Sequence, residues 1–191
     1  MYYFLLIIGI IIAGCAQEPK SADMFVNLEA PGNLQSNAPL GCIDLSTVTN
    51  KSTPADIYPG VAKCIQSGDY KKAGQLFALA GIYGRFDILR VSDSTAHQAI
   101  QVLQMNNFKS LTEKQREEFI KSITIYSNYN SIELLSLCNE IKKKGAPGYY
   151  PAYMIQHGMG AFVGSAGNGI KSDFDAAKSW RESLQNYLHC P

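Results

Sequence analysis

The sequence lacks the excess of positive charge that nucleic-acid-binding proteins carry, and it has few stretches with the pattern of β-strands. Its 17 lysine and arginine residues almost balance 16 aspartate and glutamate residues, which leaves a net charge of +1. Because phosphate backbones are bound mainly by clustered positive charge, we expect no nucleic-acid partner. Stretches with the alternating pattern of β-strands are scarce, so the composition favours an all-α fold.

Motifs for catalysis and metal binding are also missing. The chain contains no C-x-x-C, G-x-S-x-G or H-E-x-x-H motif, and its three histidines are far apart in sequence. The glycine-rich stretch at residues 164–169 lacks the lysine of a phosphate-binding loop. Because no nucleophile is visibly paired with a base, we expect no enzymatic activity, no cofactor and no metal site.

For two histidines, a catalytic or binding role is the alternative to a structural one. His97 would need Asp93 or Ser94 as catalytic partners, but these residue types are typical helix caps. His157 follows Tyr150 and Tyr153 at helical spacing. That shared face suits either a recognition surface or a core with hydrogen-bonded polar tips, and we favour the core.

The longest apolar run begins at residue 2. Residues 2–13, "YYFLLIIGIIIA", carry no charge, but this run is shorter than the roughly 20 residues that span a bilayer. Its length is typical of a secretory signal. The following "IAGC" resembles the bacterial lipobox, which implies a signal peptide at residues 1–14 and acylation of Cys15. No lysine or arginine precedes the run, which departs from the usual pattern. An ordinary signal peptide, or a buried helix with an incidental cysteine, is the alternative.

The lipobox resemblance also implies a location. In such lipoproteins an aspartate after the cysteine favours the inner membrane, whereas this chain has Ala16, which implies the outer membrane. We therefore expect a lipid anchor, a flexible tether over residues 15–40 and a helical periplasmic domain over residues 41–191.

Four further cysteines remain: Cys42, Cys64, Cys138 and Cys190. An even number in an exported chain predicts disulfides, and three pairings are possible. We favour Cys42 with Cys64, which would join the lead-in to the first helix. The other pair, Cys138 and Cys190, would then hold the C-terminal helix against an internal one.

Apolar residues recur at helical spacing from residue 53 onward, which predicts about seven short helices packed as antiparallel hairpins after an irregular lead-in. The first begins at Pro54, and the second begins after Asp69 and breaks at Gly81 and Gly84. The others are expected at residues 93–105, after Thr112, between Ser131 and Gly145, at residues 150–163, and after Ser172.

An internal repeat is one interpretation of this pattern. Residues 68–80, "GDYKKAGQLFALA", align with residues 172–184, "SDFDAAKSWRESL". The second stretch looks like a Sel1-type or TPR-like helical hairpin. Chance similarity between two amphipathic helices is the other interpretation, because the middle of the chain does not keep the period.

Three segments together resemble a known group: "IAGC", "YPGVAKCIQSGDYKKAGQLFALAGIYGRFD" and "FDAAKSWRESLQNYLHCP". They are similar to small outer-membrane lipoproteins encoded beside type VI secretion effectors, notably phospholipases. The resemblance implies an immunity protein that binds a toxic enzyme in the periplasm. It carries no binding motif to map onto this chain.

Residue type alone suggests Arg85, Arg90 and Tyr149 as partner-binding anchors on loops, because arginine and tyrosine dominate binding hot spots. The alternative function is a structural or assembly lipoprotein of the envelope, which scaffolds its partners through a repeat-like helical groove.

Overall fold

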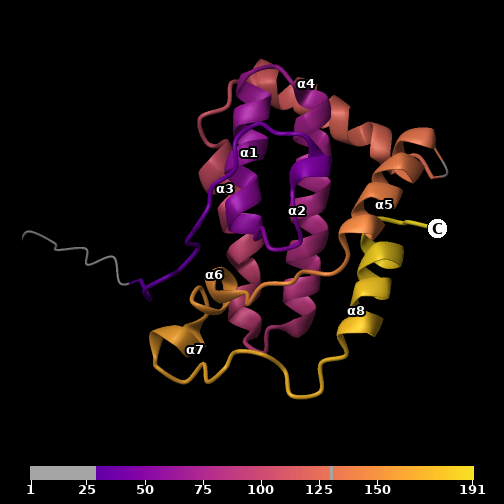
Figure 1. Cartoon of the computed structure of the whole chain (residues 1–191). Helices are drawn as coiled ribbons and strands as arrows, with labels where there is room; N and C mark the ends of the chain where they lie inside the picture. The colour runs from indigo at the N-terminus through magenta and orange to yellow at the C-terminus, as the bar shows by residue number, and fades with distance from the viewer. Residues whose placement is uncertain (1–28, 130) are drawn as a thin grey trace, which may run out of the picture.

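The structure is a computed structural model that describes residues 29–129 and 131–191, so the predicted signal peptide and Cys15 lie outside the described residues. The described part is helical and has no sheet, which confirms the all-α prediction (Figure 1). The α-helices are α1 Pro54–Gln66, α2 Tyr70–Arg90, α3 Ala99–Phe108, α4 Glu113–Thr124, α5 Ile132–Lys144, α6 Ala152–Ile155, α7 Met159–Phe162 and α8 Ala176–Glu182. In this part of the chain, none of them is both long and apolar enough to cross a membrane.

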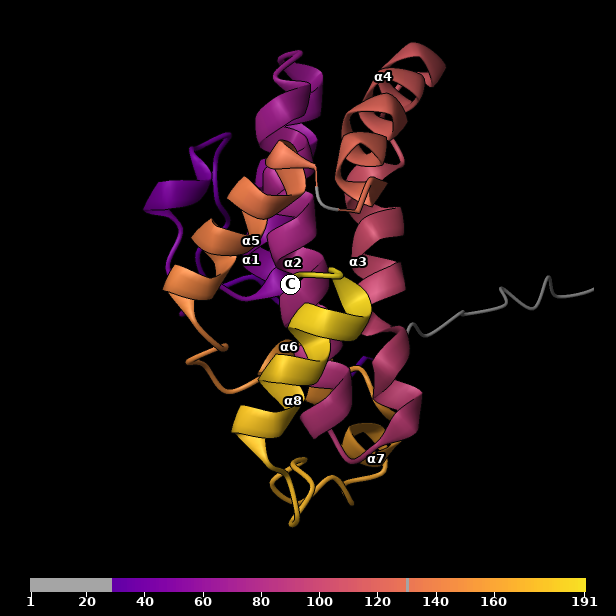
Figure 2. The same cartoon turned by 90° about the vertical axis from the view of Figure 1, so that its right-hand side faces the viewer.

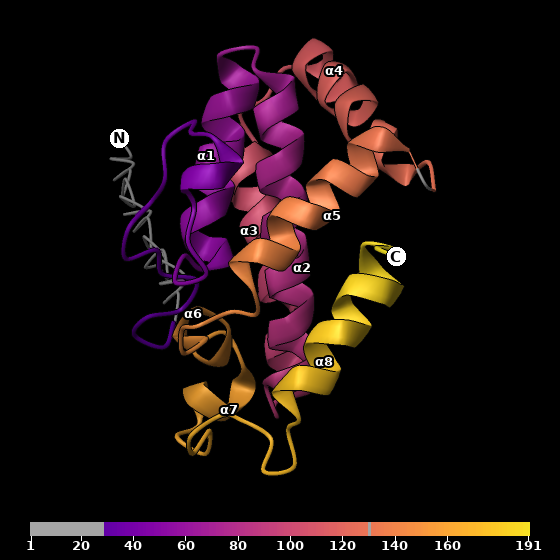
Figure 3. The same cartoon turned by 45° about the vertical axis from the view of Figure 1, so that its right-hand side comes forward.

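The helices α1, α2 and α3 stand side by side along the long axis of the molecule, and α2 is its centre. In every view α4 lies at one end of this axis and α7 at the other (Figures 1 and 2). Helices α5 and α8 pack along one flank, where the C-terminus also lies (Figure 3). The two ends of the molecule therefore present different segments to their surroundings.

Local signals fix the start of α1 as predicted. The Thr53 side chain accepts a hydrogen bond from the backbone N–H of Asp56, the Asp56 carboxylate accepts one from the Thr53 N–H, and Pro54 is the first helical residue. Ser131 caps α5 in the same region of sequence as expected, and α5 ends before Gly145. These starts were predictable because a cap depends on neighbours in the sequence.

The predicted break at Gly81 and Gly84 is wrong, since α2 continues through both residues to Arg90. Their role is close packing. A Cβ on Gly81 would lie 2.3 Å from the Tyr187 hydroxyl, and one on Gly84 would lie 2.5 Å from Cδ1 of Ile100. The absent side chains let neighbouring segments approach the α2 backbone, and this packing outweighs the low helix propensity of glycine.

Replacing Gly84 by alanine is therefore expected to destabilise the protein. Alanine gains about 1 kcal/mol of helix propensity, but the new methyl group overpacks against Ile100, which typically costs 1–3 kcal/mol. Denaturant unfolding should show a net loss. The double variant with Ile100→Ala removes the colliding atoms, so Gly84→Ala should then be neutral or stabilising in that background. A stabilised single variant would contradict this account.

The lead-in is fixed to α1 by the Asp56 carboxylate. Oδ1 accepts hydrogen bonds from the Ser36 hydroxyl at 2.7 Å and from the backbone N–H groups of Asn37 and Ala38 at 3.0 and 2.9 Å. The Leu40 N–H also donates to the Asp56 carbonyl at 2.9 Å. Residues 36–40 are therefore hydrogen-bonded to α1.

Asp56 makes the stability of this lead-in depend on pH. Burial alone would raise the pKa of Asp56, but the hydrogen bonds from Ala38, Ser36 and Thr53 lower it below 3.8. The carboxylate thus contributes stability at pH values above 3.8, and this contribution is lost as the pH falls through the lower pKa of the folded state.

We expect Asp56→Asn to lower the free energy of unfolding by about 2 kcal/mol near neutral pH. The asparagine amide has an NH₂ group, which is itself a donor and cannot accept the hydrogen bonds that the carboxylate accepts. The difference from the wild type should shrink as the pH falls below 3.8. Chemical unfolding across acidic pH measures it, with the exposed Asp173→Asn as the control. A deficit that does not change with pH would contradict the assignment.

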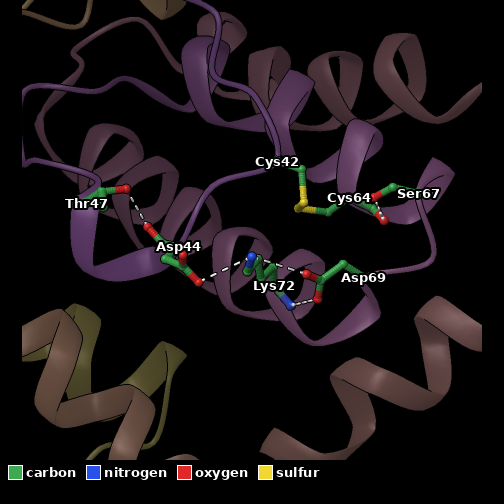
Figure 4. A network of polar contacts seen from close by, with 7 residues as sticks. All are labelled: Cys42, Asp44, Thr47, Cys64, Ser67, Asp69 and Lys72. Carbon is green, nitrogen blue, oxygen red and sulfur yellow. Dashed lines mark hydrogen bonds and ion pairs between the residues drawn. A yellow bond between two sulfur atoms is a disulfide. The ribbon is translucent and has the colours of Figure 1, made fainter.

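Both disulfides have the pairing that the sequence favoured. The sulfur atoms of Cys42 and Cys64 lie 2.00 Å apart, and those of Cys138 and Cys190 lie 2.02 Å apart. The first disulfide lies beside a polar network in which Lys72 pairs with Asp44 and Asp69, both at 3.4 Å (Figure 4). Disulfide and network together fasten the lead-in to the turn between α1 and α2.

The third, sixth and seventh helices differ from their predictions. The third starts with a 3₁₀ turn, η2 Ser94–Gln98, before α3. The sixth is divided into α6 and α7. The division has a cause: the Met159 N–H donates to the Thr95 hydroxyl and the Gly160 N–H donates to the Asp93 carboxylate, at 2.9 and 2.7 Å. These contacts hold the first N–H groups of α7, so the chain starts a separate helix there and does not extend α6.

The seventh helix begins after Asp175, whose side chain accepts from the Lys178 N–H, and not after Ser172. It continues into a π-helical turn, η4 Ser183–Tyr187. The proposed repeat is not confirmed. Ala73 in α2 is buried, whereas Ala177, the residue aligned with it in α8, is exposed.

Candidate functional site

The main candidate site is an open, apolar cavity of about 480 Å³ on the flank of α2, here called the α4–α5 groove. It lies between α2, the two helices α4 and α5, and the C-terminal segment. Its lining is Gly74, Phe77, Ala78, Ile120, Ile123, Thr124, Tyr126, Ser127, Tyr129, Leu134, Tyr187, Leu188 and His189. This lining contains no aspartate, glutamate, lysine or arginine, so the groove suits an apolar or aromatic group of a ligand.

A rigid cluster of rings lies behind the groove. The Phe77 ring meets the Phe119 ring edge-on, with centroids 5.3 Å apart, and both contact Phe108. Tyr58 closes the cluster, and its buried hydroxyl accepts a hydrogen bond from Gln104 at 2.8 Å. Interlocked aromatic rings of this kind hold a preformed surface, which reduces the entropy cost of binding.

The C-terminal segment forms one wall of the groove. His189 adopts a left-handed backbone conformation, with φ 57°, and its ring lies 5.0 Å from the ring of Tyr129 across the groove. The disulfide to Cys138 and the contact from Lys142 to the Pro191 carbonyl hold this segment against α5. A backbone conformation that is unfavourable for most residues is thus maintained beside the cavity.

Two tyrosines enter the groove against glycines of α2. Tyr187 packs on Gly81, and Tyr126 lies 3.1 Å from the position of a Cβ on Gly74. Burial raises the pKa of both hydroxyls above 10.0. Both tyrosines therefore stay protonated at neutral pH.

The rim of the groove exposes large apolar side chains. Tyr129 is 63 % exposed and Ile120 is 58 % exposed, and both line the cavity. Tyr129 lies in the link between α4 and α5, and Ile120 lies on α4. Exposed apolar residues gathered around a cavity are typical of a surface that binds another protein.

The predicted anchors Arg85, Arg90 and Tyr149 have different environments. Arg85 and Arg90 lie within α2 and not on loops. Arg85 is exposed and lines a smaller cavity of about 240 Å³ together with Tyr187, so it lies next to the α4–α5 groove. Of the three, it is the one that remains accessible to a partner.

Arg90 and Tyr149 instead take part in a buried polar cluster around Asp87. The Arg90 Nε donates to Oδ1 of Asp87 at 2.8 Å, and the hydroxyls of Tyr149 and Tyr153 donate to Oδ2 at 2.9 and 2.6 Å. The Arg90 guanidinium also lies over the rings of Phe86 and Tyr149. Burial raises the pKa of Asp87, and the Arg90 charge together with the tyrosine donors opposes that rise.

The histidines have structural partners. His97 Nε2 lies 3.1 Å from the Val91 carbonyl, and Asp93, its supposed catalytic partner, binds the Thr95 and Gly160 N–H groups. His157 Nδ1 lies 2.8 Å from Oδ1 of Asn33. Across the described residues, no three His, Cys, Asp or Glu side chains gather into a metal-binding cluster.

Sequence reasoning missed the groove because its residues come from distant segments. The buried face of α5 is Leu134, Leu137, Cys138 and Ile141, so Ile132 at the start of the same helix stays exposed. One signal was available: Ile120 adjoins the buried Phe119 and lies off the apolar stripe of a strongly polar helix. An isoleucine at such a position indicates a surface with a partner.

No protein-family model matches this chain, and the searches of curated proteins and of solved structures found no significant match. The groove, its rim and the sequence features described above are therefore the observations that bear on function.

Proposed function

We propose that this protein is a lipid-anchored binding protein of the bacterial envelope that neutralises a toxic enzyme by direct contact in the periplasm. The observation that carries the proposal is the uncharged α4–α5 groove with its exposed rim. The resemblance to immunity lipoproteins suggests a phospholipase effector of type VI secretion as the partner.

The groove and rim have the properties of an inhibitory surface. Tight binding depends on a few aromatic or arginine anchors near a desolvated centre. Tyr129 and Tyr187 provide aromatic groups at the cavity, and Arg85 provides a charge at its edge. The Cys138–Cys190 disulfide and the ring cluster keep this surface preformed.

Anchoring at Cys15 would add to the effect of such a surface. Acyl chains hold a protein at the membrane, and a tether raises the effective concentration of the binding surface there. An enzyme that attacks phospholipids acts at this same surface, so a tethered inhibitor meets it before or during attack.

A protection assay tests the function. A phospholipase effector of type VI secretion is directed to the periplasm of a test bacterium, with or without this protein. We expect survival only when the protein is present. Unchanged killing by that enzyme would end the immunity proposal, and binding only to resident envelope proteins would favour the assembly role.

Groove variants show whether protection depends on the proposed surface. Ile120→Glu and Tyr129→Glu place a charge on the rim and should abolish protection and binding. Met105→Glu is the matched control, because Met105 is an exposed apolar residue on α3 that is not part of the groove lining. Equal protection by all three variants would show that the groove is not the binding surface.

The anchor has its own test. Cys15→Ser should remove acylation and leave the protein soluble or unprocessed, as measured by membrane fractionation and intact mass. A variant that stays in the membrane fraction in the same amount and form would show that Cys15 is not the anchor.

A further inference from the structure

A second exposed apolar surface lies around α6 and α7, far from the groove. From Gly145 to Ile170 the chain contains no aspartate, glutamate, lysine or arginine, although 17 % of all residues are charged. Within this stretch the side chains of Met159, Phe162 and Val163 are 56, 48 and 64 % exposed. A segment without charged residues whose apolar side chains protrude into water is costly and indicates that something covers it.

This surface is held in place by the rest of the fold. Asp93 and Thr95 bind the N–H groups of Gly160 and Met159, as described above, and a Cβ on Gly158 would lie 2.4 Å from the Asp93 carboxylate. The Tyr150 hydroxyl donates to the Asn168 carbonyl at 2.9 Å. The loop around α7 is therefore fastened at several points and presents its apolar side chains at the end of the molecule.

The start of the described chain lies beside the same surface. The Leu34 N–H donates to the Tyr153 carbonyl at 3.0 Å, and Asn33 contacts His157. Cys15 precedes Glu29 by 14 residues, a length of chain that spans at most about 50 Å. A lipid anchor at Cys15 therefore keeps the α6–α7 end within reach of the membrane that holds the anchor.

We propose that residues 145–170 form a second membrane contact, in which Met159, Phe162 and Val163 insert at the headgroup level of the phospholipid bilayer. Apolar side chains inserted to this depth bind membranes reversibly, and they add to an acyl anchor. Exposed Tyr150 on the same surface suits the interface, where aromatic rings with a polar tip are favoured. The inference depends on the proposed anchor at Cys15.

The proposal sets the orientation of the molecule. Helix α7 lies at the end of the long axis opposite α4 in all three views (Figures 1, 2 and 3). With α7 on the bilayer, the α4 end and the exposed Ile132 beside it point away from the membrane. The groove rim is then presented to the periplasm, where a partner can reach it.

Tryptophan quenching by brominated lipids tests this contact. The full mature chain, purified with its anchor, is reconstituted into phosphatidylethanolamine–phosphatidylglycerol vesicles with or without brominated acyl chains. Phe162→Trp and, separately, Val163→Trp report on the α7 surface. Ile132→Trp is the matched control at the other end. The native Trp180 is present in every variant and contributes the same background emission.

We expect a blue shift and a loss of emission with brominated lipid for Phe162→Trp and Val163→Trp, with Ile132→Trp quenched no more than the wild type. Acylated, vesicle-bound protein with equal quenching at both ends would overturn the membrane contact and leave the anchor intact. Intact mass reports the anchor separately: a chain without acyl groups would overturn the anchor and this inference with it.

Discussion

Replacing Asp87 by asparagine is expected to lower the free energy of unfolding by about 3–5 kcal/mol, the usual cost of breaking a buried ion pair by removing one partner. Asp87 is fully buried and Arg90 is 8 % exposed. The Arg90 Nη2 lies 2.7 Å from Oδ1 of Asp87, so the carboxylate is the buried counter-charge of the guanidinium. Without the carboxylate, the guanidinium charge stays buried and uncompensated.

Urea or guanidinium unfolding measures this loss. Arg85→Ala is the control, because Arg85 is exposed on the same helix, and it should change stability by less than about 0.5 kcal/mol. A second comparison isolates the pair: Asp87→Leu with Arg90→Met should be more stable than Asp87→Leu alone, because the unpaired charge is gone. Asp87→Asn with wild-type stability would show that the pair does not hold the fold.

Removing the second disulfide should have an effect of similar size and a local consequence at the groove. Cys138 and Cys190 are 52 residues apart, and the loop-entropy model assigns such a crosslink about 4 kcal/mol. The double variant Cys138→Ser with Cys190→Ser should lower the free energy of unfolding by about this amount. The segment with Tyr187 and His189 would lose its covalent hold on α5, so binding at the groove should weaken more than stability alone explains.

The first disulfide provides the matched comparison. Cys42 and Cys64 are 22 residues apart, and the same model gives about 3 kcal/mol. Their double serine variant should lose stability but keep binding in the fraction that remains folded, because that disulfide fastens the lead-in at a different site. Thermal unfolding together with a binding titration at a temperature where both variants are folded separates the two effects. Equal loss of binding in both would contradict a specific role for the C-terminal wall.

The predicted anchors Arg90 and Tyr149 show why residue type alone does not identify a binding site. Arg90 and Tyr149 have the residue types of binding anchors, and residue type was the only guide to them. Their actual contacts, with Asp87 and with each other, join α2 to a segment roughly 60 residues later. A pairing over that distance leaves no periodic pattern in the sequence, so the same residues could equally have belonged to a surface.

The sequence by itself determined the helical class and the caps at Thr53 and Ser131, because these depend on helical periodicity and on nearby residues. It favoured one disulfide pairing among three, and the structure decided it. Only the tertiary structure decided that α2 continues through Gly81 and Gly84, since the Tyr187 and Ile100 side chains that pack there come from other segments. It also decided that residues of α2, α4, α5 and the C-terminal segment together line one groove, and that α7 lies at the end of the molecule opposite α4. The physical reason is that burial and exposure are set by which distant segments meet, and the sequence encodes that only through the packing of the whole chain.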